Sequence, residues 1–547
     1  KRHKAGEEQS HHDETSTGRL ATRYRRFMER LVESRRRRMV TYGVLVVLLL
    51  GSMALIPLRA VTVKMLPFDD KSEFQVIVDM PEGTTLERTA EVAKAIAVAV
   101  AQDESVSDVQ TYAGIAAPFN FNGLVRHYFL RRGPNVADVQ VNLVGKGERS
   151  HQSHAIALRL RPAIDSIATA YNADVKVAEI PPGPPVQATL VAEVYGPTAE
   201  ARHNAARQVR DIFESTKGVV DIDWSLTPDH GMVRAVVNQA EALRAGVSAN
   251  DVARTVAATI GGASAGLLHD DGASEAVNIR VQLADYDRGS VEDVEALPIS
   301  TQMGGRTLAT LASLRETEAP TPIFHKNLRP VVYVTADVAR ELESPAYAMI
   351  EMGDQLSEIN DGLEVHWANS PSLTEDTFMV WDGEWRITFE VFRDLGIAFA
   401  AVLILIYVLV VAWFQSFSTP LVIMAPIPLT LIGILPAHAL SGAFFTATSM
   451  IGMIALAGII VRNSILLVDF IQLELERGKT LRDAVIASGL IRARPIILTA
   501  AAVVIGGTVM VTDPIFEGLG VALMSGAVVA TLLTLVAIPL LYYEMHK

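Results

Sequence analysis

Arg462 and Asn463 lie within the apolar stretch 447–470, where a charged side chain needs an acidic partner or water. The stretch is long enough to cross a bilayer, which requires about 20 residues. A charge at that depth costs about 2.5–3.5 kcal/mol on insertion scales, so it normally has a partner inside a helix bundle. The other long apolar segments contain no Asp or Glu in their interiors, and Asp394, Asp469 and Glu517 all lie at segment edges. Arg462 therefore either faces water or pairs with a carboxylate outside this chain.

Composition indicates a membrane protein with a large water-exposed part. Of the 547 residues, 50% are hydrophobic and 20% are charged, which fits several spans plus one polar region. The absence of cysteine excludes disulfides, thiolate metal sites and a cysteine nucleophile. A net charge of −13 argues against nucleic acid as a partner. The chain begins with Lys1 and has no cleavable signal peptide, which suggests a piece of a longer protein.

Six apolar runs are predicted to be membrane-spanning helices. They are residues 39–58, 393–413, 420–440, 447–470, 495–512 and 518–542. Basic residues are abundant before the first run and in the connection 471–494, whereas the connections 441–445 and 512–517 contain none. The positive-inside rule places the basic segments in the cytoplasm. The expected location is therefore a bacterial inner membrane, with the polar region 59–392 in the periplasm.

The segment 1–38 is predicted to be a cytoplasmic basic linker. Its first part resembles a flexible polar segment, in which His11 and His12 are expected to be solvated and not to bind metal. Its arginine-rich second part, Arg19–Arg38, is next to a span, so contact with lipid headgroups is favoured over nucleic-acid binding.

The external region shows alternating strand and helix patterns that repeat. In residues 59–186 the expected order is β-α-β-β-α-β, the split-βαβ arrangement. A second copy is predicted from two pieces, residues 187–230 and 320–370, with the segment 231–319 inserted between them. The predicted fold class is therefore an α+β membrane protein with six transmembrane helices, two ferredoxin-like units and an inserted subdomain. The last five helices form a bundle at 393–542.

Four segments in the same order resemble the carboxy-terminal half of the resistance-nodulation-division (RND) efflux permeases, in particular the hydrophobe/amphiphile, AcrB-like branch. They are residues 239–262, 413–433, 458–470 and 492–500, which look like the start of the docking insertion, the junction of the eighth and ninth spans, the tenth span and the eleventh span. The resemblance covers nearly all of residues 19–545. It implies that the two α/β units are periplasmic porter subdomains and that the insertion is a docking subdomain.

The resemblance also implies a proton relay. Arg462 occupies the position of a basic residue, commonly lysine, that clusters with two aspartates of the fourth span. Thr499 matches the relay threonine, and Arg492 matches an arginine at the cytoplasmic mouth of the path. Asn463 is either a relay member or an interhelical contact. The aspartates would lie in the other half of the permease, and a static helix–helix ion pair is the alternative role for Arg462.

The family's substrate pocket is aromatic and lies in the first unit of this half. The corresponding residues here are Tyr112, Phe119, Phe121, Tyr128 and Phe129. Their spacing differs from the AcrB-like pattern, and core packing is the alternative explanation. Residues 81–231 contain no methionine, which disfavours transport of soft metals.

Two further motifs are not expected to form a binding site. His151 and His154 begin a predicted helix, where exposure is expected and not metal binding. The segment 261–266, GGASAG, is predicted to be a loop, since no GKS or GKT follows it.

The expected function is a secondary active transporter subunit that exports hydrophobic or amphipathic small molecules, driven by protons and without enzymatic activity or a cofactor. The resemblance implies four partners: the N-terminal half of the permease, further copies in a homotrimer, a periplasmic adaptor and an outer-membrane channel. One alternative is an RND-like protein that assists lipid or protein export. The other is a membrane scaffold or sensor.

Overall fold

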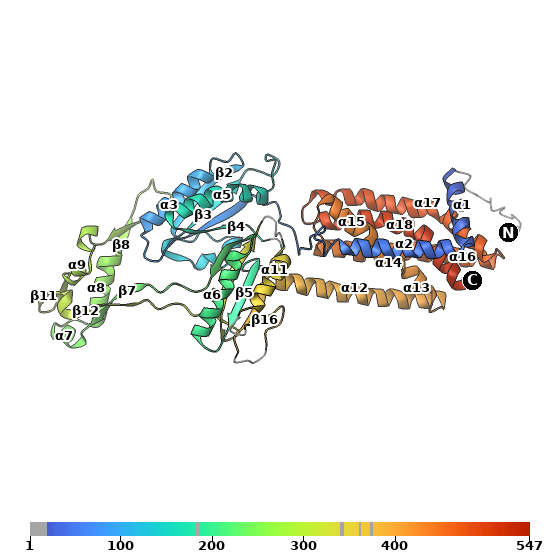
Figure 1. Cartoon of the computed structure of the whole chain (residues 1–547). Coiled ribbons are helices and arrows are strands. Elements are labelled where there is room, and N and C mark those ends of the chain that lie inside the picture. Colours follow the sequence, from blue (N-terminus) through green and yellow to red (C-terminus); the bar gives the residue numbers. More distant parts are fainter. Residues whose placement is uncertain (1–18, 182, 184, 340–343, 360–362, 372–375) are drawn as a thin grey trace, which may run out of the picture. The chain divides into compact units, whose positions relative to one another are not determined.

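The structure is a computed structural model that describes residues 19–181, 183, 185–339, 344–359, 363–371 and 376–547 (Figure 1). The N-terminal segment with His11 and His12 lies outside the described residues. The chain divides into two compact units, of which one is the insertion Leu226–Ile323 and the other comprises the rest. The two are described separately below.

Six helices in the described residues are long and apolar enough to cross a membrane. Their bounds are Arg35–Ala54 (α2), Glu384–Phe414 (α12), Thr419–Ser441 (α13 Thr419–Met424, α14 Pro426–Leu429 and α15 Leu431–Ser441), Ala447–Glu476 (α16), Leu481–Thr512 (α17 Leu481–Thr508 and η3 Met510–Thr512) and Glu517–His546 (α18). Helices α15, α16 and α17 each pack on α18, around a core that includes Leu456, Ile460 and Ile538 (Figure 1).

The connection predicted at 471–494 is mostly helical. Helix α16 continues to Glu476 and α17 begins at Leu481, so only Arg477–Thr480 separate them. The apolar run predicts a span that begins at Pro495. Here Pro495 lies inside α17, a position that membrane helices tolerate.

The N-terminal helix α1 (Arg19–Glu33) packs one face on the bundle. Its residues Met28 and Val32 are buried against Ile486 and Leu540. The next arginines begin α2, and one of them departs from the expected headgroup contact. Arg38 is fully buried, and its Nε donates to Glu544 at 2.7 Å.

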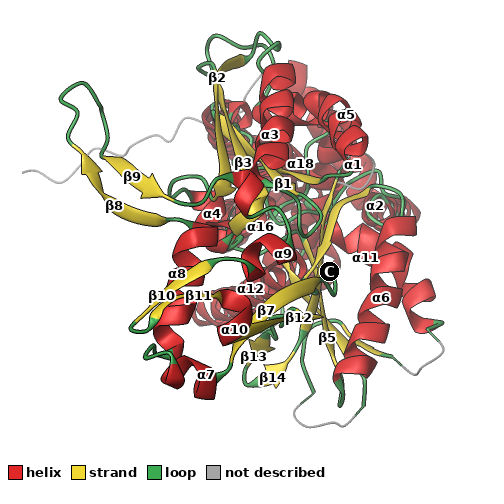
Figure 2. Ribbon diagram, turned by 90° about the vertical axis from the view of Figure 1, so that its left-hand side faces the viewer, coloured by secondary structure: helices red, strands yellow, loops and turns green. Residues whose placement is uncertain are grey.

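The first α/β unit has a four-stranded sheet with strand order β2-β3-β1-β4, covered on one face by two helices (Figure 2). Its elements are β1 Glu73–Asp79, α3 Leu86–Val100, β2 Val106–Ile115, α4 Phe121–Val125, η1 Tyr128–Leu130, β3 Arg132–Leu143, α5 Ser153–Tyr171 and β4 Asp174–Ala178. Strand β1 pairs antiparallel with β3 and β4, so the sheet has the split-βαβ order. Phe74, Ile96 and Ile164 lie in its core.

The five-stranded sheet of the second α/β unit contains one strand that was not predicted, β17. Its elements are β5 Leu190–Tyr195, α6 Ala199–Ser215, β6 Val219–Trp224, β13 His325–Lys326, β14 Arg329–Pro330, β15 Val332–Val338, α11 Pro345–Ser357, β16 Glu364–His366 and β17 Phe378–Gly383. The sheet order is β16-β17-β5-β15-β6, with β17 antiparallel to β5 and parallel to β16. Strand β17 leads directly into membrane helix α12.

The inserted unit has a small core that includes Val252, Leu308 and Leu311. Its elements are β7 Gly231–Val237, α7 Gln239–Arg244, α8 Ala249–Gly261, β8 Ala263–Leu268, β9 Val277–Val281, η2 Asp285–Asp287, α9 Val291–Glu295, β10 Pro298–Thr301, β11 Gly304–Thr307, α10 Leu308–Leu311 and β12 Ala312–Glu318. Strands β7 and β12 pair, and so do β8 and β9 (Figure 2). The predicted loop GGASAG is wrong, because most of it forms strand β8, and a two-stranded ladder provides partners for its backbone groups.

Candidate functional site

Arg462 lies on the one exposed stripe of helix α16. The exposed positions recur at helical spacing: Ile451, Ala455, Gly458, Arg462, Leu466, Asp469 and Leu473. Between them α16 is largely buried, including Asn463 and Ser464 directly after Arg462. No side chain in the described part of the chain forms a hydrogen bond or ion pair with Arg462.

The other predicted relay residues lie on the membrane helices but are not joined to Arg462 by hydrogen bonds in the described chain. The Thr499 hydroxyl donates to the carbonyl of Pro495 at 3.0 Å, within its own helix. The Arg492 guanidinium lies over the Phe470 ring, 5.2 Å from its centroid, and its Nε is buried with no hydrogen-bond partner. The relay therefore stays a prediction that concerns this chain and a further helix.

The five aromatic residues predicted to line one pocket do not come together. Phe119 and Phe129 are neighbours, with ring centroids 5.7 Å apart. Tyr112 extends from β2 and its hydroxyl donates to Gln110 at 3.0 Å. Tyr128 lines a charged cavity instead. The spacing of aromatic residues along a loop carries no information on the direction of each side chain, and the aromatic substrate pocket stays a prediction.

Residues 115–130, from the end of β2 through α4 and η1, carry five exposed large apolar side chains, here called the apolar edge. Its members are Ile115 (54% exposed), Phe119 (72%), Phe121 (44%), Leu124 (48%) and Leu130 (66%). Exposed apolar residues that gather into a patch mark sites that bind an apolar ligand or partner, which makes this segment a candidate.

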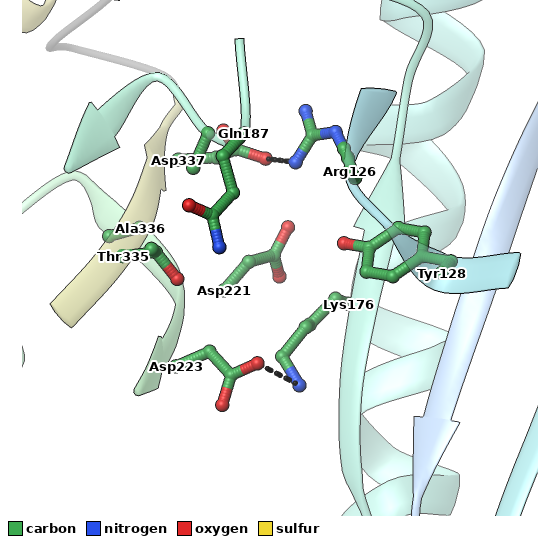
Figure 3. A pocket seen from close by; sticks show the side chains of 10 residues that line it. Arg126, Tyr128, Lys176, Gln187, Asp221, Asp223, Thr335, Ala336 and Asp337 are labelled. Carbon is green, nitrogen blue, oxygen red and sulfur yellow. Dashed lines mark hydrogen bonds and ion pairs between the residues drawn. The ribbon is translucent and has the colours of Figure 1, made fainter. Parts of the chain in front are cut away.

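A cavity of about 410 Å³, counted with its open mouth, lies between the two α/β units (Figure 3). It is lined by Arg126, Tyr128, Lys176, Gln187, Ala188, Asp221, Asp223, Thr335, Ala336 and Asp337. Sequence reasoning did not identify this cluster, because its charges come from segments far apart in the chain. The only local signal is the alternation of charged and apolar residues in strands β4 (DVKVA) and β6 (VVDIDW).

Ion pairs cross the cavity from one α/β unit to the other. Arg126 Nη1 lies 2.8 Å from Asp337 Oδ2. Lys176 Nζ lies 3.0 Å from Asp223 Oδ2 and 2.8 Å from Asp79 Oδ2 within its own unit.

Just outside the lining, Arg161 of α5 makes a bidentate pair with Asp221, with Nη2 donating to Oδ2 at 2.8 Å. Arg161 and Asp221 are 10% and 5% exposed, so water screens their pair only weakly.

The neighbouring charges shift the pKa values of Asp337, Lys176 and Asp79 in favour of their charged forms. Burial alone would raise the pKa of Asp337, but the Arg126 guanidinium and donors from Thr189 outweigh burial and lower it. Burial likewise opposes the charge of Lys176, yet the carboxylates around it raise its pKa well above the ordinary value. Asp79 has a pKa of about 2, because Lys176 and Arg131 outweigh its burial. The cavity therefore presents fixed charges of both signs.

The described residues contain no group of three or more His, Asp or Glu side chains placed to hold a metal ion. His154, predicted to be exposed, is instead part-buried: it stacks on Phe68 and its Nδ1 lies 2.8 Å from Glu179 Oε1. The His151 side chain is exposed, and its Nδ1 lies 2.9 Å from Ser150 Oγ. The H-x₂-H spacing therefore forms no ligand pair here.

Comparison with known proteins gives relatives of low identity. SwrC, a swarming motility protein of Bacillus subtilis, is 24% identical over 366 residues, which cover 65% of this chain and 33% of SwrC. CzcA, the cobalt-zinc-cadmium resistance protein of Cupriavidus metallidurans, is 24% identical over 66% of the chain and 34% of its own length. CnrA, a nickel and cobalt resistance protein of the same organism, is also 24% identical. The matched region spans about a third of these relatives.

Two crystal structures of a heavy metal efflux pump have the same fold. They match 96% of this chain with TM-scores of 0.75 and 0.76 at 21% and 22% identity. The chain covers 51% and 52% of those chains, about half of each. These structures show the fold, and the relatives give the AcrB-like branch no support of its own. Residues 1–546 match the AcrB/AcrD/AcrF family, and on that match the chain belongs to this family of RND efflux permeases.

Proposed function

We propose that this chain is part of a proton-driven secondary transporter, not an enzyme, that exports hydrophobic or amphipathic small molecules across the cell envelope. The observation that carries the proposal is Arg462, a charge on the exposed stripe of a membrane helix with no acidic partner among the described residues. Lipid is a costly neighbour for a guanidinium, so this stripe faces another helix. Carboxylates on that helix would carry the protons.

The exposed stripe indicates where the partner helix packs. Gly458 lies one turn from Arg462, and a Cβ built there meets nothing within 4 Å. Small residues let membrane helices approach closely. Gly458→Leu should therefore leave this chain folded but weaken its association with the other half of the permease. Co-purification of separately tagged halves measures this, and undiminished association would place the partner helix elsewhere.

The apolar edge and the charged cavity together support an amphipathic substrate. An amphiphile carries an apolar body and a polar or charged group, and transport sites combine apolar lining with a few polar contacts. The first α/β unit supplies both kinds of surface, through Phe119 and Phe129 on one side and Arg126 and Lys176 on the other.

Divalent metal cations are a second candidate substrate, favoured by the names of CzcA and CnrA. Against it, the chain has no cysteine, and the described residues contain no cluster of metal ligands. Growth of a strain that lacks its own efflux pumps and expresses the complete transporter decides between amphiphile export and metal export. Protection against cationic dyes and detergents supports the amphiphile, whereas protection only against cobalt, zinc or nickel supports metal export.

The proposed setting is the bacterial inner membrane, in a homotrimer with a periplasmic adaptor and an outer-membrane channel. Hairpin β8–β9 of the inserted unit supports a partner surface, because Leu268, Ile279 and Val281 are 54%, 44% and 59% exposed. The alternative, lipid or protein export, predicts co-purified lipid and no adaptor.

Arg462→Ala in the complete transporter tests the proton role. Efflux of an amphiphilic dye should be abolished while the protein remains folded and inserted. Arg494→Ala, which removes an exposed arginine from α17, is the matched control. Efflux that survives Arg462→Ala would remove Arg462 from the relay.

A further inference from the structure

Asp337 connects the cavity to a second segment of the chain. One carboxylate oxygen, Oδ2, receives the Arg126 guanidinium at 2.8 Å from the first α/β unit. The other oxygen, Oδ1, accepts from the Thr189 hydroxyl at 2.7 Å and from the Thr189 N–H at 3.1 Å. Asp337 therefore has strong donors on both oxygens, which makes the position of Thr189 depend on that of Arg126.

Thr189 in turn holds the beginning of membrane helix α12. The N–H of Glu384, the first residue of α12, donates to the Thr189 carbonyl at 3.2 Å. The preceding Gly383 has φ +72°, and a Cβ there would lie 2.7 Å from the Ala188 carbonyl oxygen and 3.0 Å from that of Thr189. Only glycine permits this approach. The start of α12 is therefore packed directly on the backbone of residues 188–189.

The Glu384 side chain makes this contact sensitive to charge. It is 8% exposed, and its Oε1 has no hydrogen-bond partner among the described residues. The charges of Lys64 and Asp337 both act on it. A buried carboxyl with an unsatisfied oxygen is costly to hold, so a small displacement of Asp337 changes the stability of this first turn.

We propose that Thr189 is a positioning residue that links the state of the cavity to the first turn of α12, through the connected contacts Arg126–Asp337–Thr189–Glu384. When Arg126 separates from Asp337, the carboxylate loses its strongest partner, Thr189 shifts with it, and the hydrogen bond to the Glu384 N–H weakens. The consequence for transport rests on the proposed function, whereas the structural link does not.

Hydrogen exchange of the full chain in lipid nanodiscs tests the link directly. Arg126→Gln should speed exchange in the peptide spanning Trp381–Phe389 on the order of tenfold, and Thr189→Val should do the same. The double variant should exchange no faster than either single variant, because both break one series of contacts. Thr189→Ser, which keeps the hydroxyl, should exchange as the wild type does.

The matched control is Arg159→Gln. It breaks an ion pair to Asp103 of the same chemistry in the first α/β unit, with contacts of 2.8 and 3.0 Å, but outside this series. It should leave exchange at α12 unchanged. The link is overturned if Arg126→Gln affects only amides near residue 126, or if the effects of the two single variants multiply.

A transport measurement separates positioning from general stabilisation. In proteoliposomes that contain the complete transporter, the ethidium carried per proton should fall in Thr189→Val and return in Thr189→Ser. An unchanged ratio in Thr189→Val overturns the positioning role. If the wild type moves neither ethidium nor metal cations with protons, the proposed function fails, and the exchange experiment still decides the link.

Discussion

Arg161→Gln should destabilise the contact between the two α/β units more than any surface substitution on the same helix. Arg161 of α5 is bidentate to Asp221 of β6, and the two side chains are 10% and 5% exposed. Truncating the arginine leaves a buried carboxylate without its counter-charge. Breaking a buried ion pair in this way costs about 3–5 kcal/mol.

The helix supplies its own control two residues away. Arg159 pairs with Asp103 in similar geometry, but its side chain is 42% exposed. Exposed pairs contribute about 0.2–1 kcal/mol, so Arg159→Gln should have a small effect. Both substitutions remove one guanidinium from α5, and they differ mainly in burial.

Thermal unfolding in detergent, followed by intrinsic tryptophan fluorescence, measures the difference. For domains of about 150–250 residues, 1 kcal/mol shifts the Tm by about 2–4 °C. Arg161→Gln should therefore lower the Tm by about 6–20 °C, and Arg159→Gln by less than about 4 °C. Equal shifts for the two variants would refute the reasoning, since burial would then not decide the cost.

The chemistry of Asp221 gives a second check on the same pair. Burial raises the pKa of Asp221, although Arg161 acts to lower it. Without Arg161 the folded protein should bind a proton at this carboxyl as the pH falls. Stability of Arg161→Gln should therefore increase toward lower pH relative to the wild type. A double variant, Arg161→Met with Asp221→Leu, should be more stable than Arg161→Gln, because no buried charge remains.

Three further predictions concern other parts of the chain. Gly433→Ala should destabilise the helix bundle by about 1–3 kcal/mol through overpacking. The new Cβ would lie 2.5 Å from Val529 and 2.9 Å from a backbone oxygen of α18. Gly506→Ala, whose Cβ would have nothing within 4 Å, is the control, and the Tm of the two variants in detergent measures the difference. Glu193→Gln should flatten the dependence of Tm on pH between about 5 and 8. Burial and Asp382 raise the pKa of Glu193 to about 7, so the wild type loses a stabilising proton as the pH rises through that value. Lys176→Met should reduce the loss of Tm between about pH 4 and 2. In the wild type Lys176 helps to hold the pKa of Asp79 at about 2, and without it this pKa would return toward its ordinary value. The same loss of Tm between about pH 4 and 2 in both proteins would contradict this.

The membrane helices could be predicted because length and hydropathy alone identify a span. The errors lie at their ends, where hydropathy no longer discriminates. Pro495 was taken as a start although it lies inside α17, and polar residues such as Glu474 continue α16 beyond the apolar run. Glu474 is buried and pairs with Arg477 at 2.7 Å, a local contact three residues along the chain that hydropathy does not report.

Strand β17 was missed for a related reason. Its residues Phe378, Met379, Val380 and Trp381 are all buried, so no alternation marks it as a strand. A short apolar run with both faces covered cannot be told from the beginning of the following helix by periodicity. The strand ends at Gly383, whose φ is positive, and helix α12 begins at the next residue. A glycine in the sequence does not by itself indicate such a boundary.

The cavity shows the limit of local patterns more clearly. Arg126 and Asp337 are 211 positions apart in the chain, and their ion pair exists only because two separate sheets pack together. Spacing in the sequence reports on faces of one element, not on which elements meet. The charged lining therefore had to come from the structure, whereas Arg462 could be identified by its apolar surroundings alone.

The type of cation at position 462 constrains how the complete transporter can use protons. Lysine can release its proton when buried, but a guanidinium keeps its charge at any physiological pH. In the proposed relay Arg462 therefore acts as a fixed counter-charge, and the proton moves on groups that face it. The exposed stripe of α16 offers Asp469, two turns away, but no carboxylate beside Arg462 among the described residues. The proposed function therefore assigns proton binding to carboxylates on a helix that packs on this stripe, with pKa values that the charge of Arg462 would lower. Replacing Arg462 with lysine should keep that effect but add a group that can titrate.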